Sequence, residues 1–277
     1  MKKVLILGAN GYLGARLYYD LRGNFKAYGT YHREQFCKDF IHLDITVQDE
    51  LSEVFRKYNP DFIVHAANYP SPRYAVGNEE GYKKLNLTAT RLIVNTANKI
   101  GARVVFISTL APSILKNIYG QLKLESEAVV KKVEAGYLVI RPCLILGFSP
   151  NTTNGRPFNR ILKHLDNKTT AEFDTSWKFR PTYVGHVSEV IGTCIEKNIF
   201  NKTLSVFCDS LQTQYSTARD ILKPFGVVVK PIDKGVDIPI AEADEAELEN
   251  LGLPTISYEE MIAKIHWEIK NRGEFVL

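Results

Sequence analysis

The fold is decided near the start of the chain, by the stretch Val4-Leu5-Ile6-Leu7-Gly8-Ala9-Asn10-Gly11-Tyr12-Leu13-Gly14. Its four apolar residues predict a buried strand, and the apolar positions of 15–21 recur at helical spacing. Between strand and helix, the spacing GxxGxxG lets Gly8 form a sharp turn, lets a pyrophosphate approach Gly11, and lets helix and strand pack closely at Gly14. A strand, a glycine turn and a helix in this order predict a dinucleotide-binding βα unit.

Apolar runs recur along the first half of the chain and alternate with segments of helical periodicity. Strands are predicted at 4–7, 26–31, 40–43, 61–65, 103–107 and 137–140, and helices at 15–21, before Tyr58, at 79–99 and at 119–134. This alternation predicts an α/β fold, a doubly wound parallel sheet of the Rossmann type. Its ligand is expected across the carboxyl ends of the strands.

Periodicity weakens after Gly147, where an Asn-rich loop covers 149–157. Helices are predicted near 158–166, 187–197, 243–251 and 257–271, and a strand at 203–207 is expected to return to the sheet edge. We therefore expect a dinucleotide-binding domain at 1–148, rejoined by 181–210. A smaller substrate-binding lobe is expected from 149–180 and 211–277.

Composition narrows the class of protein. The 277 residues are 45% hydrophobic, enough for a full core, and 35 Lys and Arg against 31 Asp and Glu give a net charge too mild to indicate nucleic acid. No apolar stretch reaches the roughly 18–20 residues that span a bilayer, so no membrane partner is expected. Four scattered cysteines without metal-ligand spacing predict free thiols, a cytoplasmic location and no metal site.

The end of the second strand bears on the choice of dinucleotide. An NAD site carries an acidic residue about 20 residues after the glycines, but here the chain continues His32-Arg33. Because a guanidinium suits a 2′-phosphate, NADP is the expected cofactor, with NAD as the alternative since Glu34 is close by. Asp44 follows the third strand, where it either accepts a hydrogen bond from adenine or stabilises its own turn.

Tyr119 and Lys123 are the candidate catalytic pair. They stand four residues apart on a predicted helix and project from the same face. An ammonium beside a phenol lowers the Tyr pKa from about 10, so that the phenol can exchange a proton with a carbonyl or alcohol oxygen. A hydroxyl of Ser108 or Thr109, at the end of the fifth strand, can hold the same oxygen. A Tyr-Lys pair that did not follow such a strand would be read as an ordinary contact on a helix surface.

Together, the glycine stretch, Ser108-Thr109, the segment 119–127 and Arg141-Pro142 resemble the extended short-chain dehydrogenase/reductase superfamily, over nearly the whole chain. Leu251-Gly252-Leu253-Pro254 is similar to the tail of its nucleotide-sugar enzymes. The short length, Ser108-Thr109 and the segment 180–184 are most similar to the dTDP-4-dehydrorhamnose reductase branch.

The resemblance implies roles for individual residues. Tyr119 is the expected proton donor, Lys123 is expected to bind the nicotinamide ribose, and Thr109 to orient the carbonyl with Ser108 beside it. Arg180 either binds sugar-nucleotide phosphates or is a surface charge beside Trp177. The remaining cofactor-binding residues are expected to be Gly8, Asn10, Gly11, Tyr12, Leu13, Gly14, His32, Arg33, Asp44, Ile45, Ala66, Ala67, Asn68, Pro142 and Cys143.

The expected activity is reduction of a keto group on a sugar, carried on a nucleotide. Leu110 and Ala111 replace the acidic pair of the superfamily's dehydratases, which argues against dehydration, and the loop from Leu110 to Ile118 is shorter than is usual there. Two alternatives stay open: a nucleotide-sugar epimerase that retains NAD, and a non-catalytic, cofactor-binding regulatory subunit. The resemblance also implies a homodimer through the helices at 79–99 and 119–134.

Overall fold

A parallel sheet forms the centre of the molecule. The computed structural model describes residues 1–69, 71–110, 112, 117–241, 243–244 and 246–277. Within these residues, seven strands follow the order β11-β6-β5-β4-β1-β2-β3, and every neighbouring pair is parallel. The strands are β1 (Lys3–Leu7), β2 (Lys26–Tyr31), β3 (Ile41–His42), β4 (Phe62–His65), β5 (Arg103–Ile107), β6 (Tyr137–Pro142) and β11 (Lys202–Val206). The predicted doubly wound sheet is confirmed, and the strand predicted at 203–207 does join its edge.

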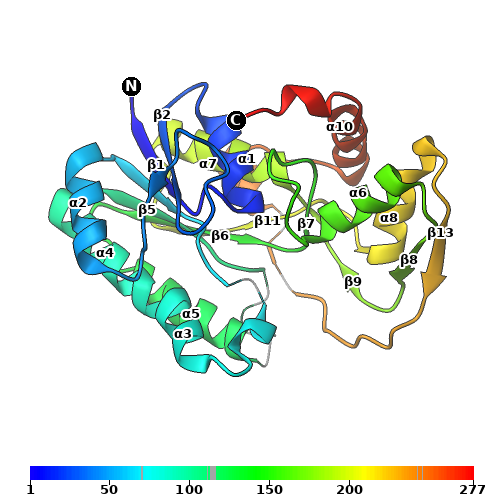
Figure 1. Cartoon of the computed structure of the whole chain (residues 1–277), viewed down its shortest axis with the longest axis horizontal. Coiled ribbons are helices and arrows are strands. Elements are labelled where there is room, and N and C mark those ends of the chain that lie inside the picture. The colour runs from blue at the N-terminus through cyan, green and yellow to red at the C-terminus, as the bar shows by residue number, and fades with distance from the viewer. Residues whose placement is uncertain (70, 111, 113–116, 242, 245) are drawn as a thin grey trace.

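Helices cover both faces of this sheet (Figure 1). One face carries α1 (Tyr12–Leu21) and α7 (Val184–Lys197); the other carries α2 (Gln48–Tyr58), α4 (Ala89–Ile100) and α5 (Ile118–Val130). Period-two alternation explains the two cores, because Val4 and Ile6 face the first pair of helices whereas Leu5 and Leu7 face the second group. The carboxyl ends of the strands are thereby left for a ligand.

Two predicted helices have different bounds in the structure. The segment predicted as one helix at 79–99 consists of α3 (Glu79–Lys83), a π-helical turn η2 (Lys84–Thr88) and α4. The helix predicted at 119–134 ends at Val130, where turns replace it. Local periodicity identified both helices, but it does not reveal an inserted π turn or a frayed end.

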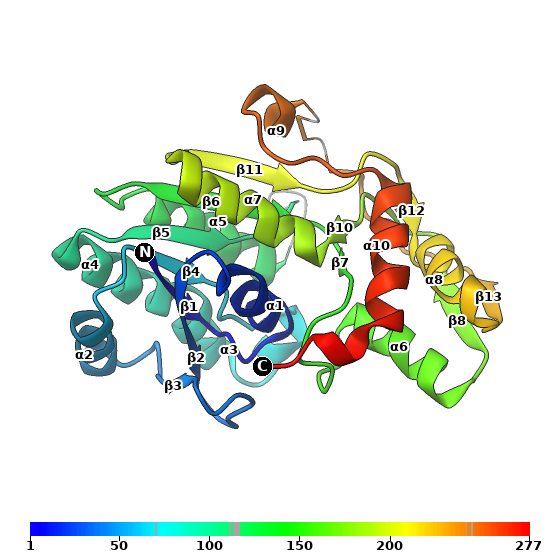
Figure 2. The same cartoon turned by 90° about the horizontal axis from the view of Figure 1, so that it is seen from above.

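A second group of elements gathers to one side of the sheet (Figure 2). Its apolar core is formed by residues of α6 (Pro157–Asn167), α8 (Gln214–Leu222) and α10 (Tyr258–Lys270). The short strands around it pair as β7 (Ile145–Leu146) with β10 (Thr182–Tyr183), β9 (Lys178–Phe179) with β12 (Gln212–Thr213), and β8 (Ala171–Asp174) with β13 (Val229–Ile232). The helix predicted near 243–251 is the short α9 (Glu247–Asn250), and residues 242 and 245 lie outside the described part of the chain.

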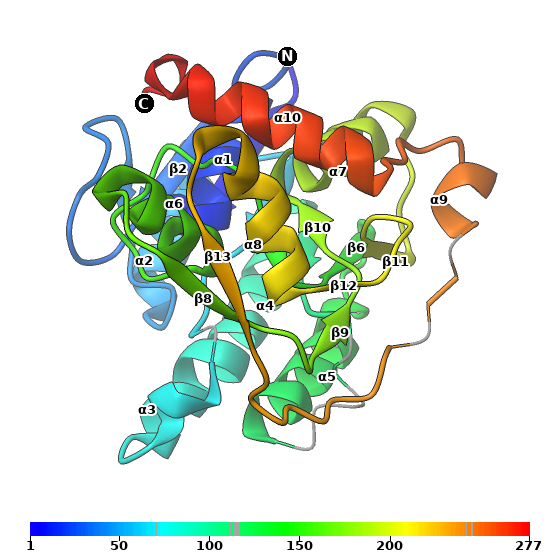
Figure 3. The same cartoon turned by 90° about the vertical axis from the view of Figure 1, so that its right-hand side faces the viewer.

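The three remaining short helical segments are η1 (Pro72–Ala75), η3 (Lys223–Phe225) and η4 (Arg272–Glu274). A long segment after β13 passes β9 and continues to α9 (Figure 3). No helix in the described part of the chain is long and apolar enough to span a membrane.

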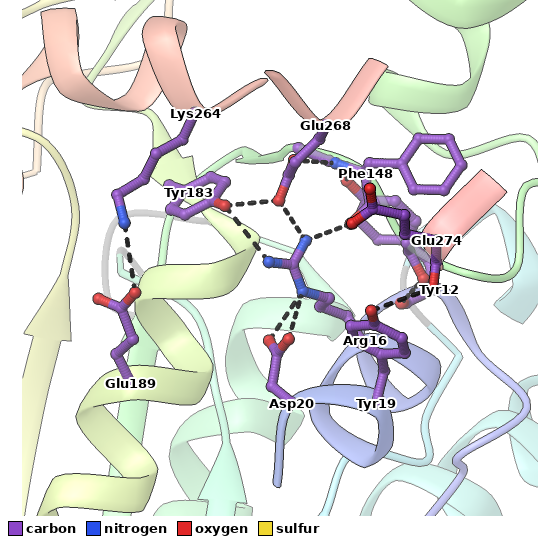
Figure 4. Close-up of polar contacts among 12 residues, drawn as sticks. Tyr12, Arg16, Tyr19, Asp20, Phe148, Tyr183, Glu189, Lys264, Glu268 and Glu274 are labelled. Atoms are coloured by element: carbon purple, nitrogen blue, oxygen red, sulfur yellow. Dashed lines mark hydrogen bonds and ion pairs between the residues drawn. The ribbon is translucent and has the colours of Figure 1, made fainter. Parts of the chain in front are cut away.

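A buried polar cluster joins α10 to α1 (Figure 4). The Arg16 guanidinium donates hydrogen bonds to Asp20, to the Phe148 carbonyl oxygen at 2.6 Å and to Glu268 Oε1 at 2.5 Å. Glu268 also accepts from the Phe148 N–H at 2.8 Å and from the Tyr183 hydroxyl at 2.5 Å. The last helix is therefore held against the first by buried, paired charges.

Candidate active site

The glycine turn forms a close-packed cradle at the end of β1. Gly8 has φ +83°, and a Cβ there would lie 2.8 Å from the Cα of Ala67. A Cβ on Gly14 would lie 2.1 Å from the Gly8 carbonyl oxygen. Gly11 begins α1 without a side-chain cap, and the first turn of α1 holds no acidic residue. These features fit a bound pyrophosphate, because the first amides of the helix face outward unblocked.

Asn10 connects this turn with the loop after β2. Its Nδ2 donates to the Glu34 carbonyl oxygen at 2.8 Å, and its Oδ1 accepts from the Phe36 N–H at 2.9 Å. Arg33 is exposed on the same loop. The preference for NADP therefore stays a prediction that rests on an exposed guanidinium.

Asp44 stabilises its own turn, the second of the two alternatives left open by the sequence. Its Oδ1 accepts from both the N–H and the hydroxyl of Thr46, each at 2.8 Å. Burial acts to raise the pKa of Asp44, but these hydrogen bonds and the charges of His32 and Lys84 lower it below its usual value. His32 Nε2 lies 3.5 Å from Asp44 Oδ2, and Ile45 is buried in the core. Asp44 Oδ2, which lies near His32, can still accept a hydrogen bond from a ligand.

A cavity of about 360 Å³ opens beyond the carboxyl ends of β4, β5 and β6. This volume lies within the range of about 300–1,000 Å³ typical of small-molecule sites. Ten of the residues predicted from the sequence line it together: Tyr12, Leu13, Ala66, Asn68, Ser108, Thr109, Tyr119, Pro142, Cys143 and Arg180. Trp177 and Phe179 add aromatic surface, and 238–241, from the segment after β13, closes another part of the wall.

Tyr119 lies in the cavity wall, but its environment differs from the prediction. Burial, together with the nearby Tyr82 hydroxyl, raises the pKa of Tyr119 to about 12, although the charge of Arg156 acts to lower it. The prediction that the Tyr119 pKa falls toward neutral is wrong for this structure. The phenol is therefore protonated at neutral pH and can donate its proton.

Lys123 is buried beneath Tyr119 rather than in the cavity wall. Its Nζ donates to the Ile107 carbonyl oxygen at 2.7 Å and lies 5.8 Å from the centre of the Tyr119 ring. Burial lowers the pKa of Lys123 to about 7, against the opposing charge of Glu127. The ammonium is directed to the end of β5, at the edge of the site.

Ser108 and Thr109 differ in what their hydroxyls are free to bind. The Ser108 hydroxyl donates at 2.5 Å to Glu127 Oε1, and both Glu127 oxygens also accept from the Arg141 guanidinium, at 2.9 and 2.6 Å. The Ser108 hydroxyl is thus already bonded to Glu127 of the Glu127–Arg141 ion pair. Thr109 is half-buried in the cavity wall, which leaves it the better placed of the two to contact a substrate.

Cys143, expected against the nicotinamide, is an unreactive thiol. Its N–H donates to Thr182 Oγ1 at 2.9 Å, and burial raises the pKa of its thiol to about 11. Ala67 packs against Gly8, behind the cavity wall. Of the loop from Leu110 to Ile118, residues 111 and 113–116 lie outside the described part; Leu110, which is apolar, lines the cavity.

Arg156 is the functional candidate that the sequence did not reveal. It lines the cavity at the N-cap of α6, immediately before Pro157. Within the described part of the chain, the cavity lining contains three cations, Arg156, Lys178 and Arg180, and no carboxylate. The Arg156-Pro157 pair at the end of the Asn-rich loop could have indicated that Arg156 stands at the start of a helix, since Pro commonly occupies the first helical position.

Comparison with known proteins agrees with this geometry. The family model described as RmlD substrate binding domain matches residues 1–111. The dTDP-4-dehydrorhamnose reductase of Escherichia coli (strain K12) is 28% identical over 157 residues, 50% of each chain. The structure of dTDP-4-dehydrorhamnose reductase from Bacillus anthracis str. Ames in complex with NADP superimposes with a TM-score of 0.81 at 21% identity, covering 97% of this chain and 99% of that one.

The chain is therefore similar in sequence to dTDP-4-dehydrorhamnose reductases, and its fold is that of the extended short-chain dehydrogenase/reductase enzymes. Its predicted resemblance to the dTDP-4-dehydrorhamnose reductase branch is thereby confirmed. A further relative, methionine adenosyltransferase 2 subunit beta of Rattus norvegicus, is 25% identical over 91% of this chain and 83% of its own length.

Proposed function

We propose that the protein is an NAD(P)-dependent reductase of a keto group on a nucleotide-linked sugar. The observation that carries the proposal is one cavity lined by Tyr119, Thr109, Pro142 and Cys143, with Ala66 and Asn68 linking it to the glycine turn. The NADP complex of the Bacillus anthracis relative supports a nicotinamide dinucleotide as cofactor. We expect NADP over NAD because of Arg33.

Different residues of the cavity transfer the proton, bind the carbonyl oxygen and exclude water. A bound nicotinamide supplies the hydride that reduces the carbonyl carbon. The Tyr119 hydroxyl, protonated at neutral pH, transfers its proton to the carbonyl oxygen, and the resulting tyrosinate regains a proton from solvent. Thr109 donates a hydrogen bond to the same oxygen. The apolar segment 238–241 and Phe179 exclude water from the reacting carbon.

Lys123 acts from beneath the tyrosine. Its charge would stabilise the tyrosinate as it forms, and its ammonium, held at the Ile107 carbonyl oxygen, would be available to bind the nicotinamide ribose of the cofactor. Glu127, one helical turn further on, orients this region through Ser108 and Arg141.

The test begins with fluorescence titration of the purified protein with NADPH and NADH, after its copurifying cofactor is identified. Tyr119→Phe is then expected to lower turnover of a dTDP-4-keto sugar by about 10² to 10⁴, the usual contribution of a general acid, with cofactor affinity nearly unchanged. Unchanged turnover in this variant would falsify the role of Tyr119. Tightly retained NAD that does not exchange during turnover would instead indicate the epimerase.

A second candidate function is a regulatory subunit that binds cofactor without turnover. The coverage of the Rattus norvegicus relative, 91% of this chain, favours it. It predicts NADPH binding with no reduction of any keto sugar, and a stable complex with the methionine adenosyltransferase of the same organism on size-exclusion chromatography. Turnover that depends on Tyr119 and Thr109 favours the reductase over this candidate.

A further inference from the structure

The cavity has a cationic wall beside the proposed proton donor. Arg156 and Tyr119 line the same cavity, and they lie close enough for the positive charge of Arg156 to favour the ionised phenol. The groups that most affect the Arg156 guanidinium, besides burial, are Tyr119, Tyr74, Tyr12 and Arg73. None of these is a carboxylate. Arg156 thus faces the reacting end of the cavity, and no acidic side chain of the described residues lines this cavity to neutralise it.

The Asn-rich loop holds this arginine in place through buried amides. Asn159 Nδ2 donates to the carbonyl oxygen and the Oδ1 of Asn154, at 3.1 and 2.9 Å, and Asn154 Oδ1 also accepts from the Arg156 N–H at 3.4 Å. Asn151 Nδ2 donates to the Asn10 carbonyl oxygen at 2.6 Å. The loop that presents Arg156 is therefore bonded directly to the glycine turn.

The energetics of this arrangement favour a bound anion. A guanidinium moved out of water loses hydration that only a charge of opposite sign restores fully. Burial lowers the pKa of Arg156, which reflects this cost. A carboxylate or phosphate in the cavity would pair with the guanidinium through two parallel hydrogen bonds, because the planar guanidinium carries N–H donors at the matching spacing.

We propose that Arg156 binds an anionic group, a carboxylate or a phosphate, on the part of the substrate that carries the reacting carbonyl. This inference deepens the proposed function and rests on it, since Tyr119 defines where the carbonyl lies. Arg180, which lines the same cavity as Trp177 and Phe179, is the expected contact of the nucleotide phosphates. The substrate class is then an acidic sugar nucleotide or a sugar phosphate derivative rather than a neutral deoxysugar.

The experiment uses the full chain loaded with NADP⁺ and a matched pair of probes. UDP-glucuronate and UDP-glucose differ only in the carboxylate that replaces a hydroxymethyl group, and UDP alone carries the diphosphate. Isothermal titration should show that UDP-glucuronate binds about tenfold to a hundredfold more tightly than UDP-glucose, the range expected for a hydrogen-bonded charge pair. Equal affinities for the two would overturn the proposal.

Variants identify the residue responsible. Arg156→Met should bring the two affinities together, Arg156→Lys should restore part of the difference, and NADPH affinity should stay unchanged as a sign of an intact fold. Arg160→Met, one turn further along α6 and exposed, is the matched control and should keep the wild-type preference. An equal loss for all three probes in Arg156→Met would place the guanidinium on the diphosphate and contradict the proposal.

A further pair of probes separates this proposal from the proposed function. If no nucleotide binds, free glucuronate and glucose 6-phosphate are compared with glucose. Binding of either anion that depends on Arg156 supports the anion site while removing the nucleotide from the proposed substrate. If neither anion binds more tightly than glucose, the anion site is refuted as well.

Discussion

Two buried bases lie near the carboxyl ends of neighbouring strands, and of the two, Lys123 is the one that titrates near neutral pH. His65, at the end of β4, shares a hydrogen bond of 3.1 Å with Thr90 Oγ1, and Lys123 contacts the end of β5. Burial, reinforced by the charge of Lys123, lowers the pKa of His65 to about 3. His65 is therefore a core residue that is neutral at physiological pH. It is no candidate for proton transfer at neutral pH.

Lys123 predicts a specific dependence of stability on pH. Its pKa is about 7 in the folded chain and near 10.5 when exposed, so between these values the unfolded chain holds more protons. The free energy of unfolding then rises with pH from about 7 to 10.5 by up to about 1.4 kcal/mol per pH unit, and the full cost of burial applies below pH 7. Lys123→Met should remove this slope.

Urea unfolding of the cofactor-free protein at pH 7, 8.5 and 10 measures the effect. The gain in stability of Lys123→Met over the wild type should be largest at pH 7 and shrink as pH rises. Lys131→Met, at an exposed residue directly after α5, serves as the control and should show no such trend. A constant difference across the three pH values would contradict a buried, titrating Lys123.

At the level of single residues, local sequence patterns predicted which residues form the site better than they predicted the burial and charge around each residue. The spacing of Tyr119 and Lys123 placed both on one helix face, but the Tyr119 pKa is raised by burial and by nearby Tyr82, which are contacts of the folded chain. Arg156 was missed because its position depends on a loop that Asn151 bonds to the distant Asn10 and that Asn159 bonds to Asn154. No periodicity records such contacts.

At the level of elements, the glycine turn shows how one residue type fixes a strand, a helix and a binding site together. A Cβ at Gly14 would meet backbone atoms of Gly8 at 2.1 and 2.8 Å, and these cannot rotate away. Gly14→Ala is therefore expected to displace α1 from β1, at a cost of about 1–3 kcal/mol in stability, with loss of NADPH binding. Thermal unfolding and fluorescence titration measure both effects.

The control is Gly23→Ala, just after the same helix, where a Cβ would meet no atom within 4 Å. It should bind NADPH like the wild type. If Gly14→Ala did so too, the close packing of α1 on the turn would have no part in binding.

At this same level, the order of strands and helices was predictable because each buries an apolar face whose period is visible in the sequence. The π turn over Lys84–Thr88 was not predictable, since it accompanies tertiary bonds of 2.7 and 3.2 Å between the Asn86 side chain and the backbone of Tyr69. Where tertiary contacts override the local conformational preference, hydrophobic periodicity alone does not predict the type of helix.

At the level of the whole molecule, the C-terminal helix is fastened to the nucleotide-binding half by the Arg16 cluster (Figure 4). Tyr12, next to Arg16 on α1, also binds the Gly147 carbonyl oxygen and lines the cavity. Displacement of α10 would therefore disturb the cavity wall as well as the core. The sequence did not reveal this connection, since its partners lie about 250 residues apart.

Glu268→Gln tests how firmly this connection holds the two halves together. The change leaves the buried Arg16 guanidinium with only Asp20 as a carboxylate partner, so stability should fall by about 2–4 kcal/mol, within the range for a broken buried ion pair. Lys264→Met, on the same helix, removes an ion pair to Glu189 at 3.5 Å whose side chains are 47% exposed, and should cost less than about 1 kcal/mol. Urea unfolding compares the two variants, and limited proteolysis should release the C-terminal segment faster in Glu268→Gln alone. Equal small losses in both would mean that apolar packing, rather than the Arg16 cluster, holds α10 in place.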